Sequence, residues 1–449
     1  MDELNLDFEA QEPVVPVTSE TDIPVPQRRR RPKSKQQIFK EKYLPFLILG
    51  TAGLLMLSFI FGSLSLNRTR KNELAKADRI AQLLADEAAD LKSRAAVMAA
   101  EYDYENAMKL LASYSGGLST NPELMALHSQ YENALVEMVV WDDLSKIPNL
   151  SFRTLVADFQ KASADPDRGK RYASRYITTE EFSSILSQLY ENGYVLVSLY
   201  DFAQPTTAAD GSVGIRKTSI RLPEGKKPII LTQEGVNYYS HMEKCGGFAD
   251  QLIVNAAGEM TCVLGEQEGA FDLVPVLNAF LAEHPDFSYE GARATIAVSG
   301  YEGLFGMMLD ESGAIKAVAD KLRSQGYDIA CYTYADMEYA DFGAAGVKED
   351  LGKWSEKITP ILGETDILVY PTGGDIKGHD SYSGTKYDAL HEFGFRCFIG
   401  VENGAAWGMT TGEYARQTRT LVTAEYLKTH PEWYAGMFDA AAVLSAERG

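Results

Sequence analysis

Residues 221–242 read RLPEGKKPIILTQEGVNYYSHM, and they contain a short apolar run at 228–232. An apolar run of this length between polar residues is typical of a strand that is buried on both faces. Comparable runs occur along the rest of the chain at 194–199, 251–255, 294–298, 327–334, 366–370 and 396–401. The C-terminal two thirds of the sequence therefore predict a sheet of short, buried strands.

Helical patterns lie between several of these strands. They cover residues 178–191, 274–283, 314–324, 347–362 and 386–393, and the first opens with the helix-capping sequence Thr-Thr-Glu-Glu. Apolar strands that alternate with helices predict a parallel sheet or a barrel with helices outside it. In both architectures the functional residues collect at the C-terminal ends of the strands, so we look for candidate site residues there.

The charge of the chain is acidic and uneven. The 449 residues carry a formal net charge of -20, and the eight acidic and eight basic side chains of residues 1–43 cancel, so the whole net charge lies beyond them. Proteins that bind the nucleic-acid backbone have a basic face, which excludes that class. The acidic part is compatible with neutral or amino-sugar ligands and does not favour anionic polymers.

Residues 44–66 read LPFLILGTAGLLMLSFIFGSLSL, 23 residues without a charge. This length is sufficient for a transmembrane helix. More Lys and Arg precede the span than follow it, which predicts a cytoplasmic N-terminus and extracytoplasmic C-terminal domains. A cleavable signal peptide is the alternative, which the long polar segment before the span disfavours. Residues 1–43 are expected to be a disordered cytoplasmic tail whose basic segment touches anionic lipid headgroups.

Residues 68–145 follow the span and show a helical period. The segments AAEYDYENAMKLL (99–111) and NPELMALHSQYENAL (121–135) resemble one tetratricopeptide-type unit. One such unit cannot bury its own apolar face, and no second copy is found. We therefore expect an all-α helical hairpin that serves as a stalk.

Five ordered segments carry a resemblance to a known family. They are YITTEEFSSILSQLYENGYVLVSLYDF (176–202), residues 221–242, ADKLRSQGYDIACYTYADMEY (319–339), EKITPILGETDILVYPTGGD (356–375) and FGFRCFIGVENG (393–404). Together they are similar to polysaccharide deacetylases of the NodB-homology type (carbohydrate esterase type 4), and most of all to membrane-anchored forms from Gram-positive bacteria. The resemblance implies an irregular (β/α) barrel over residues 147–440 that acts on acetylated cell-wall sugars.

The family's chemistry requires a divalent metal, usually zinc, which one Asp and two His hold while a second Asp acts as the base. Here Glu234 falls on the base position, and Gly235, Tyr332 and Asp336 fall on the three ligand positions. Glycine and tyrosine do not replace the missing ligands. The resemblance therefore predicts the fold together with degenerate metal and catalytic motifs, and no metal cofactor is expected.

An upstream segment that tends to be His-rich in these relatives also departs from the pattern, because Asn149 and Arg153 stand there. Two interpretations remain open. The acidic residues are remnants in a degenerate pocket, or they form a substitute oxygen-rich site for Ca²⁺ or Mn²⁺. The candidates for that second site are Glu234, Asp336, Asp375, His379 and Asp380.

Aromatic residues near the predicted strand ends could bind pyranose rings without any hydrolysis. The candidate substrate-binding residues are Tyr238, Tyr332, Tyr334, Asp375 and Trp407. Ordinary packing is an equally good explanation of the aromatic ones. Among the four cysteines, Cys245 and Cys262 flank a predicted hairpin and could form a disulfide, which an extracytoplasmic compartment would permit.

The sequence leaves three candidate functions. The first is a membrane-anchored pseudoenzyme that binds or scaffolds cell-wall polysaccharide. The second is an active carbohydrate deacetylase with a rearranged site in which Glu234 is the base, and Asp336 is the other candidate catalytic residue. The third is a protein that docks a protein partner through the helical hairpin. Nucleic acid is not an expected partner.

Overall fold

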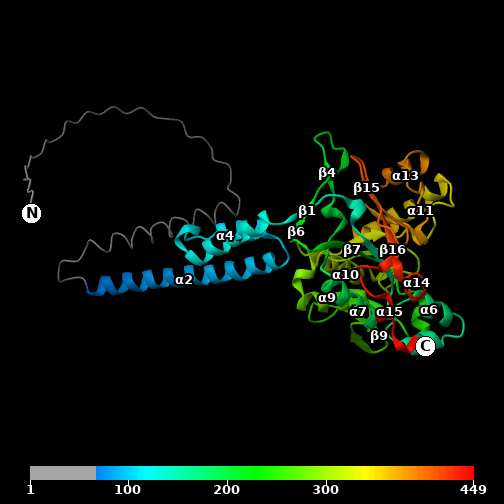
Figure 1. Ribbon diagram of the computed structural model, residues 1–449, viewed down its shortest axis with the longest axis horizontal. Helices are drawn as coiled ribbons and strands as arrows, with labels where there is room; N and C mark the ends of the chain where they lie inside the picture. Colours follow the sequence, from blue (N-terminus) through cyan, green and yellow to red (C-terminus); the bar gives the residue numbers. More distant parts are fainter. Residues whose placement is uncertain (1–66, 449) are drawn as a thin grey trace, which may run out of the picture. The chain divides into compact units, whose positions relative to one another are not determined.

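The computed structural model describes residues 67–448 (Figure 1). The predicted tail and transmembrane span at 1–66 lie outside the described residues. Among the described residues, no helix combines the length and apolar character that a membrane crossing requires.

The helical segment that follows residue 66 contains three α-helices. They are α2 (Asn67–Ala100), α3 (Tyr104–Ala112) and α4 (Pro122–Val136). Helices α3 and α4 pack against each other and correspond to the two segments of the predicted repeat unit. Asn121 caps α4 by accepting hydrogen bonds from two backbone N–H groups, and Pro122 occupies the first turn, where proline is tolerated.

The centre of the fold is a closed barrel of seven parallel strands (Figure 1). In the order around the ring they are β7 (Lys227–Glu234), β11 (Thr295–Val298), β12 (Asp328–Cys331), β13 (Ile367–Val369), β14 (Cys397–Val401), β16 (Ala415–Leu421) and β2 (Asn149–Arg153). Strand β2 pairs in parallel with β7, which closes the ring. The fold is therefore a (β/α) barrel, as expected.

The smaller strands lie outside this ring. They are β1 (Val139–Trp141), β3 (Tyr194–Leu196), β4 (Ala203–Thr207), β5 (Val213–Lys217), β6 (Ile220–Leu222), β8 (Gln251–Val254), β9 (Met260–Leu264), β10 (Gln267–Gly269) and β15 (Gly408–Thr410). Strand β3 pairs with the first half of β7 and β11 pairs with its second half. Two of the predicted strands, β3 and β8, are thus not members of the barrel, and β8 forms an antiparallel sheet with β9 and β10.

Helices surround the barrel (Figure 1). They are α5 (Phe159–Ala164), α6 (Gly169–Arg175), α7 (Thr179–Glu191), α8 (Ser240–Cys245), α9 (Leu273–Glu283), α10 (Ser312–Ser324), α11 (Ala344–Lys357), α12 (Thr359–Leu362), α13 (Thr385–Glu392), α14 (Ala424–Thr429) and α15 (Ala440–Val443). The predicted cap of α7 is confirmed, because Thr178 and Glu181 form a reciprocal capping box. The predicted helix at 347–362 is instead divided into α11 and α12.

Alternate residues of the barrel strands belong to two different cores. Leu150 and Phe152 of β2 and Leu231 of β7 face outward and pack with the helices. Ile230 of β7 and Ile399 of β14 belong to the inner cluster instead. This alternation follows from the two-residue period of a strand, and it directs Asn149, Ser151 and Arg153 of β2 into the barrel.

Candidate functional site

The C-terminal ends of the barrel strands form a mouth at which the backbone is strained. Among the described residues, six of the eight non-glycine residues with positive φ lie in the loops after β7, β11, β12 and β13. These six are Tyr238, Glu302, Phe305, Thr333, Asp336 and Thr372. Such conformations persist where the surrounding structure enforces them, and they cluster at functional sites. The strain therefore marks this end of the barrel as the candidate site.

Glu234 is the last residue of β7 and points into the barrel just below the mouth. Its carboxylate forms an ion pair of 2.6 Å with Arg419 of β16 and accepts a hydrogen bond of 3.2 Å from the Tyr332 hydroxyl. Arg153 lies opposite Glu234 in the strand register, with its Nε 3.9 Å from the carboxylate. Burial alone would raise the pKa of Glu234, but the two guanidinium groups lower it below its usual range.

Arg419 is wholly buried and its terminal nitrogens are fully used. They donate to the carbonyl oxygens of Ile399, Gly400 and Tyr370 as well as to Glu234. A carboxylate held by such a neighbour is a stable anion and a weak base. The role of catalytic base that the family position implies for Glu234 is therefore not supported by its surroundings.

Asp336 lies at the exposed rim of the mouth, in the loop after β12. Asp350 of α11 positions this loop by accepting hydrogen bonds from the backbone N–H groups of Tyr334 and Ala335. The residue as a whole is exposed, but its carboxyl group is partly shielded from water, and this raises the pKa of Asp336 to about 6. The positive charge of Arg153 acts in the opposite direction and lowers the pKa. Asp336 is thus the better placed of the two predicted acids for proton transfer.

The positions that hold the metal in the family do not fit a metal in this chain. Gly235 offers no side chain, and a Cβ there would lie 3.6 Å from the Tyr239 hydroxyl. The Tyr332 hydroxyl is directed down to Glu234. Within residues 67–448, no group of three or more His, Cys, Asp or Glu side chains could hold a metal ion. The substitute oxygen-rich site that the sequence left open is therefore not assembled.

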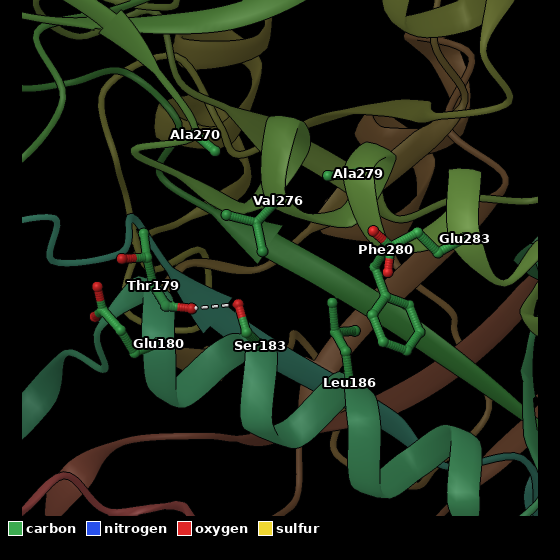
Figure 2. A pocket seen from close by; sticks show the side chains of 9 residues that line it. All are labelled: Thr179, Glu180, Ser183, Leu186, Ala270, Val276, Ala279, Phe280 and Glu283. Carbon is green, nitrogen blue, oxygen red and sulfur yellow. Dashed lines mark hydrogen bonds between the residues drawn. The ribbon is translucent and has the colours of Figure 1, made fainter.

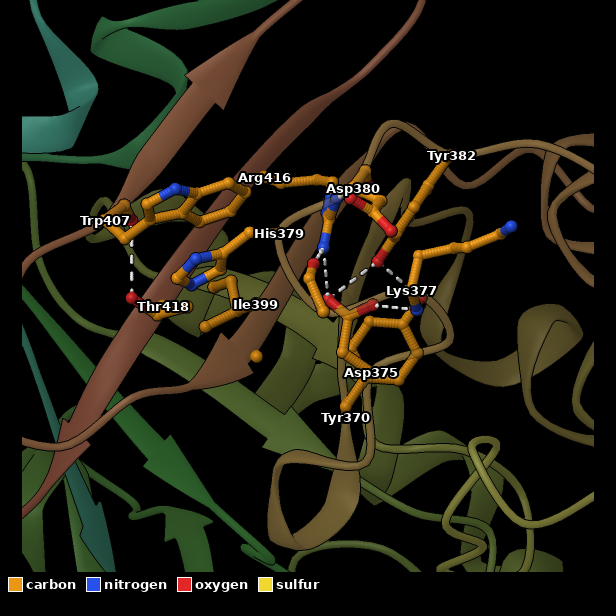
Figure 3. A network of polar contacts seen from close by, with 12 residues as sticks. Tyr370, Asp375, Lys377, His379, Asp380, Tyr382, Ile399, Trp407, Arg416 and Thr418 are labelled. Carbon is orange, nitrogen blue, oxygen red and sulfur yellow. Dashed lines mark hydrogen bonds and ion pairs between the residues drawn. The ribbon is translucent and has the colours of Figure 1, made fainter.

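Asp375 belongs to a separate network on the outside of the barrel (Figure 3). Its carboxylate accepts hydrogen bonds from Arg416 at 2.9 Å and from the Tyr382 hydroxyl at 3.0 Å. Arg416 also binds the backbone carbonyl of Asp380. His379 pairs with Glu402 at 2.7 Å. The acidic residues that the sequence grouped with Glu234 thus have partners of their own here.

Trp407 lies in the same outer network (Figure 3). Its ring stacks on His379 with a centroid distance of 4.5 Å, and the Arg416 guanidinium lies 5.0 Å from its centroid. Trp407 thus packs on protein groups, and its expected contact with substrate stays a prediction.

Two of the tyrosines expected to bind substrate also have structural roles. Tyr238 is buried in the outer core, where its hydroxyl donates to Asp272 at 2.6 Å. Tyr334 packs on Gly300, and its hydroxyl meets Lys357 of α11. The alternation of inward and outward residues along a strand could not predict the burial of Tyr238. The backbone has a positive φ at Tyr238, which turns the chain after the strand ends.

The side chains that do face the mouth are partly different. Tyr239 follows Tyr238 and is half-buried, with its ring 5.7 Å from His241 and 6.2 Å from Tyr301. Tyr301, in the loop after β11, is 53 % exposed. Asn237 ties the two loops together by donating to the carbonyl oxygens of Ser299 and Gly303. These loops hold one half-buried and one exposed tyrosine, and Tyr239 lies near enough to Asp336 to feel its charge.

Cys245 and Cys262 do not form the disulfide that the sequence left possible. All four cysteines are free: Cys262 is buried beside the Tyr238 hydroxyl at 3.8 Å, and the Cys245 thiol donates to the backbone carbonyl of Met242. The hairpin itself is confirmed as β8 and β9. Cys262 and Cys245 therefore act as small packing residues.

A separate groove lies between α7 and α9 on the outer surface (Figure 2). Its volume is about 370 Å³, with Leu186, Val276 and Phe280 as its apolar wall and Glu180 and Glu283 among its polar residues. None of its lining residues belongs to the mouth of the barrel.

No protein-family model and no curated protein matches this sequence. Among solved structures, the chain is similar to a Streptococcus pyogenes deacetylase in complex with acetate, with 12 % identity, a TM-score of 0.36 and coverage of 63 % of this chain and 97 % of that one. The chain is also similar to a Bacillus anthracis polysaccharide deacetylase, with 13 % identity, a TM-score of 0.36 and coverage of 67 % of this chain and 69 % of that one. A third similar structure is a de-N-acetylase from Aggregatibacter actinomycetemcomitans, with 16 % identity, a TM-score of 0.35 and coverage of 62 % of this chain and 94 % of that one.

These likenesses concern the fold alone. These three solved proteins are described as deacetylases or as a de-N-acetylase.

Proposed function

We propose that this chain is a polysaccharide-deacetylase-like protein that binds cell-wall glycan at its barrel mouth without metal-dependent hydrolysis. The observation that carries the proposal is the buried Glu234–Arg419 ion pair. It places a guanidinium group against the carboxylate that would otherwise activate water. A shared fold does not carry catalysis when the residues of the site differ.

The ligand surface is provided by Tyr239 and Tyr301, which flank the mouth. Tyrosine rings offer an apolar face to a pyranose ring and a hydroxyl group to its polar edge. Residues 44–66 would anchor the protein as a single transmembrane helix, with the N-terminus in the cytoplasm and the barrel outside. This location would bring the mouth to the wall polysaccharide.

The test combines three measurements on the purified full-length protein. We expect saturable binding of acetylated wall oligosaccharides, no acetate release from them, and no bound metal in stoichiometric amount. Acetate release that follows added Zn²⁺ or Mn²⁺ would contradict the pseudoenzyme assignment. A protein that neither binds nor hydrolyses these sugars would contradict the glycan function altogether.

The active deacetylase is a second candidate because of Asp336. Its carboxyl lies at the rim of the mouth with a pKa of about 6, which suits a general base. In this candidate Asp336 replaces Glu234 as the base. Acetate release that is lost in Asp336→Asn and retained in Glu338→Gln, a nearby rim carboxylate, would favour it over the pseudoenzyme.

A further inference from the structure

The helical hairpin is docked on the floor of the barrel, at the end opposite the mouth. Tyr102, in the turn between α2 and α3, is buried in the inner cluster, and its hydroxyl donates to the backbone carbonyl of Asp286 at 2.7 Å. The backbone N–H of Glu290 donates to the carbonyl of Glu101 at 2.7 Å. Asp286 and Glu290 lie between α9 and β11, so the contact is made where a barrel strand begins. We call this contact the joint.

The backbone is strained on both sides of the joint. Tyr102 has a φ of 66° and Glu290 has a φ of 48°. Among the described residues, these are the two non-glycine residues with positive φ that do not lie at the mouth. Such conformations cost free energy and persist where neighbouring contacts enforce them. Separation of the joint would release this strain, so the docked state depends on the contacts across it.

The chain crosses from the hairpin to the barrel at a different place. Helix α4 ends at Val136, and β1 begins at Val139 and pairs with β6. The connection between them is therefore Glu137 and Met138. A connection of two residues can act as a hinge, because it permits the helices to turn while β1 stays paired.

The joint holds more acidic than basic side chains. Glu101 extends over Gly291 of the barrel loop, where a Cβ would lie 3.7 Å from its carboxylate oxygen. The titratable and charged groups that face Glu101 and Glu290 are Asp103, Glu105, Lys109, Asp201, Tyr289 and Arg293. Five carboxyl groups therefore meet two cations at this contact.

The surroundings make ionisation of the two glutamates unfavourable. Glu290 is exposed as a whole, but its carboxyl group is partly shielded from water, as is that of Glu101. This shielding raises the pKa of both residues, and the charge of Asp103 adds to the effect on each. The cations act in the opposite direction, Arg293 on Glu101 and Lys109 on Glu290. Since these pKa values lie above the ordinary ones, docking is favoured at low pH and weakens as pH rises through the raised values.

We propose that the joint is a pH-sensitive contact that holds the hairpin on the barrel floor when Glu101 and Glu290 are protonated and releases it when they ionise. In the ionised state the two carboxylates and Asp103 repel one another, and the strain at Tyr102 and Glu290 favours separation. The hairpin then turns about its connection to β1. Because the proposed membrane anchor precedes this hairpin, release would leave the barrel mouth free to change its orientation. The proposal stands whether or not the mouth binds glycan.

The test measures the distance between hairpin and barrel in the purified full-length protein. Spin labels are attached at Ser129→Cys on α4 and Ser324→Cys on α10, which are exposed positions. The background is Cys245→Ser, because the other three cysteines are buried. Double electron–electron resonance should give one closed distance at about pH 5 and a several-fold smaller closed population at about pH 7.5.

Three variants identify the groups responsible. Glu101→Gln combined with Glu290→Gln should keep the joint closed at both pH values, because neither side chain can ionise. Glu132→Gln, which alters an exposed acid of α4, is the matched control and should leave the pH response unchanged. Tyr102→Ala removes the side chain that is buried in the floor and should give the open distances at both pH values. If Tyr102→Ala does not fold, the glutamine pair decides.

Three results would overturn the proposal. The first is an identical distance distribution of the wild-type protein at the two pH values. The second is a pH response of the opposite sign, with the closed population larger at the higher pH. The third is a pH response that survives in the variant with both glutamines, which would assign it to Asp201 instead.

Discussion

Arg419 of β16 and Glu234 of β7 form an ion pair of 2.6 Å inside the barrel, although 185 residues separate them in the sequence. The strands that carry them are held apart in the ring by β2, which pairs with both. The pair therefore exists only when the barrel is closed, and it links the stability of the closed barrel to the electrostatics of the mouth.

Removing one partner of this pair should be strongly destabilising. Arg419→Met leaves Glu234 as a buried carboxylate with a weaker partner in Arg153, and we expect a loss of about 3 kcal/mol or more in the free energy of unfolding. The double variant Glu234→Leu with Arg419→Met should recover part of that loss, because no uncompensated charge remains. Urea denaturation measures both. Lys316→Met, which breaks the exposed pair with Asp320, is the control and should change stability by less than about 0.5 kcal/mol. Equal losses in the single and double variants would contradict this interpretation.

Asp272 joins the ends of two barrel strands beneath the mouth. It accepts hydrogen bonds from the backbone N–H of Leu155 at 2.8 Å, from the Gln233 amide at 2.7 Å and from the Tyr238 hydroxyl at 2.6 Å. Asp272→Ala leaves these buried donors unpaired, so we expect a loss of about 2–3 kcal/mol in stability. Tyr238→Phe removes one bond and should cost about 1 kcal/mol. Thermal unfolding would contradict the prediction if the order of the two losses were reversed.

The far end of the barrel should make stability depend on pH. Burial raises the pKa of Asp201 to about 7 and that of Asp328 to about 6. Because these folded-state values lie above the unfolded ones, the folded state binds more protons, and stability should fall as pH rises from about 4 to about 7. Asp328→Asn should raise the melting temperature at pH 7.5 and flatten this dependence. A melting temperature that is lowered equally at pH 5 and pH 7.5 would show that the carboxylate is needed for structure.

Tyr301 and Trp407 should separate binding from stability. Tyr301 is exposed at the mouth, so Tyr301→Ala should weaken glycan binding several-fold and change the melting temperature little. Trp407 stacks on His379 and Arg416, so Trp407→Ala should lower the melting temperature and leave the affinity for glycan unchanged. Measuring both quantities for both variants is decisive, because the opposite pattern would restore Trp407 as a sugar-binding residue.

The four cysteines give a chemical test of which thiols are buried in the native protein. Cys245 is half-buried, while Cys262, Cys331 and Cys397 are buried. A thiol reagent should therefore modify one cysteine in the native protein and four after denaturation. Cys245→Ser should remove the native reaction. Native protein with only two reactive thiols after denaturation would instead reveal a disulfide.

The apolar runs of the sequence predicted β7, β11, β12, β13 and β14, because these strands are buried on both faces. Two barrel strands, β2 and β16, were not predicted. Strand β16 reads ARQTRTL, and its polar residues include Gln417 and Arg419, which face the barrel interior. A strand whose buried partners are polar lacks an apolar run, so its sequence is typical of an exposed segment.

The sequence by itself determined the class of fold, because buried strands and the helices between them can be predicted from residue types and local periods. Only the tertiary structure decided which polar residues form the site. It paired Glu234 with Arg419 and separated Asp375 and Trp407 from them. The physical reason is that the closure of a parallel barrel brings together strand ends that are distant in the chain, and no local pattern records those neighbours.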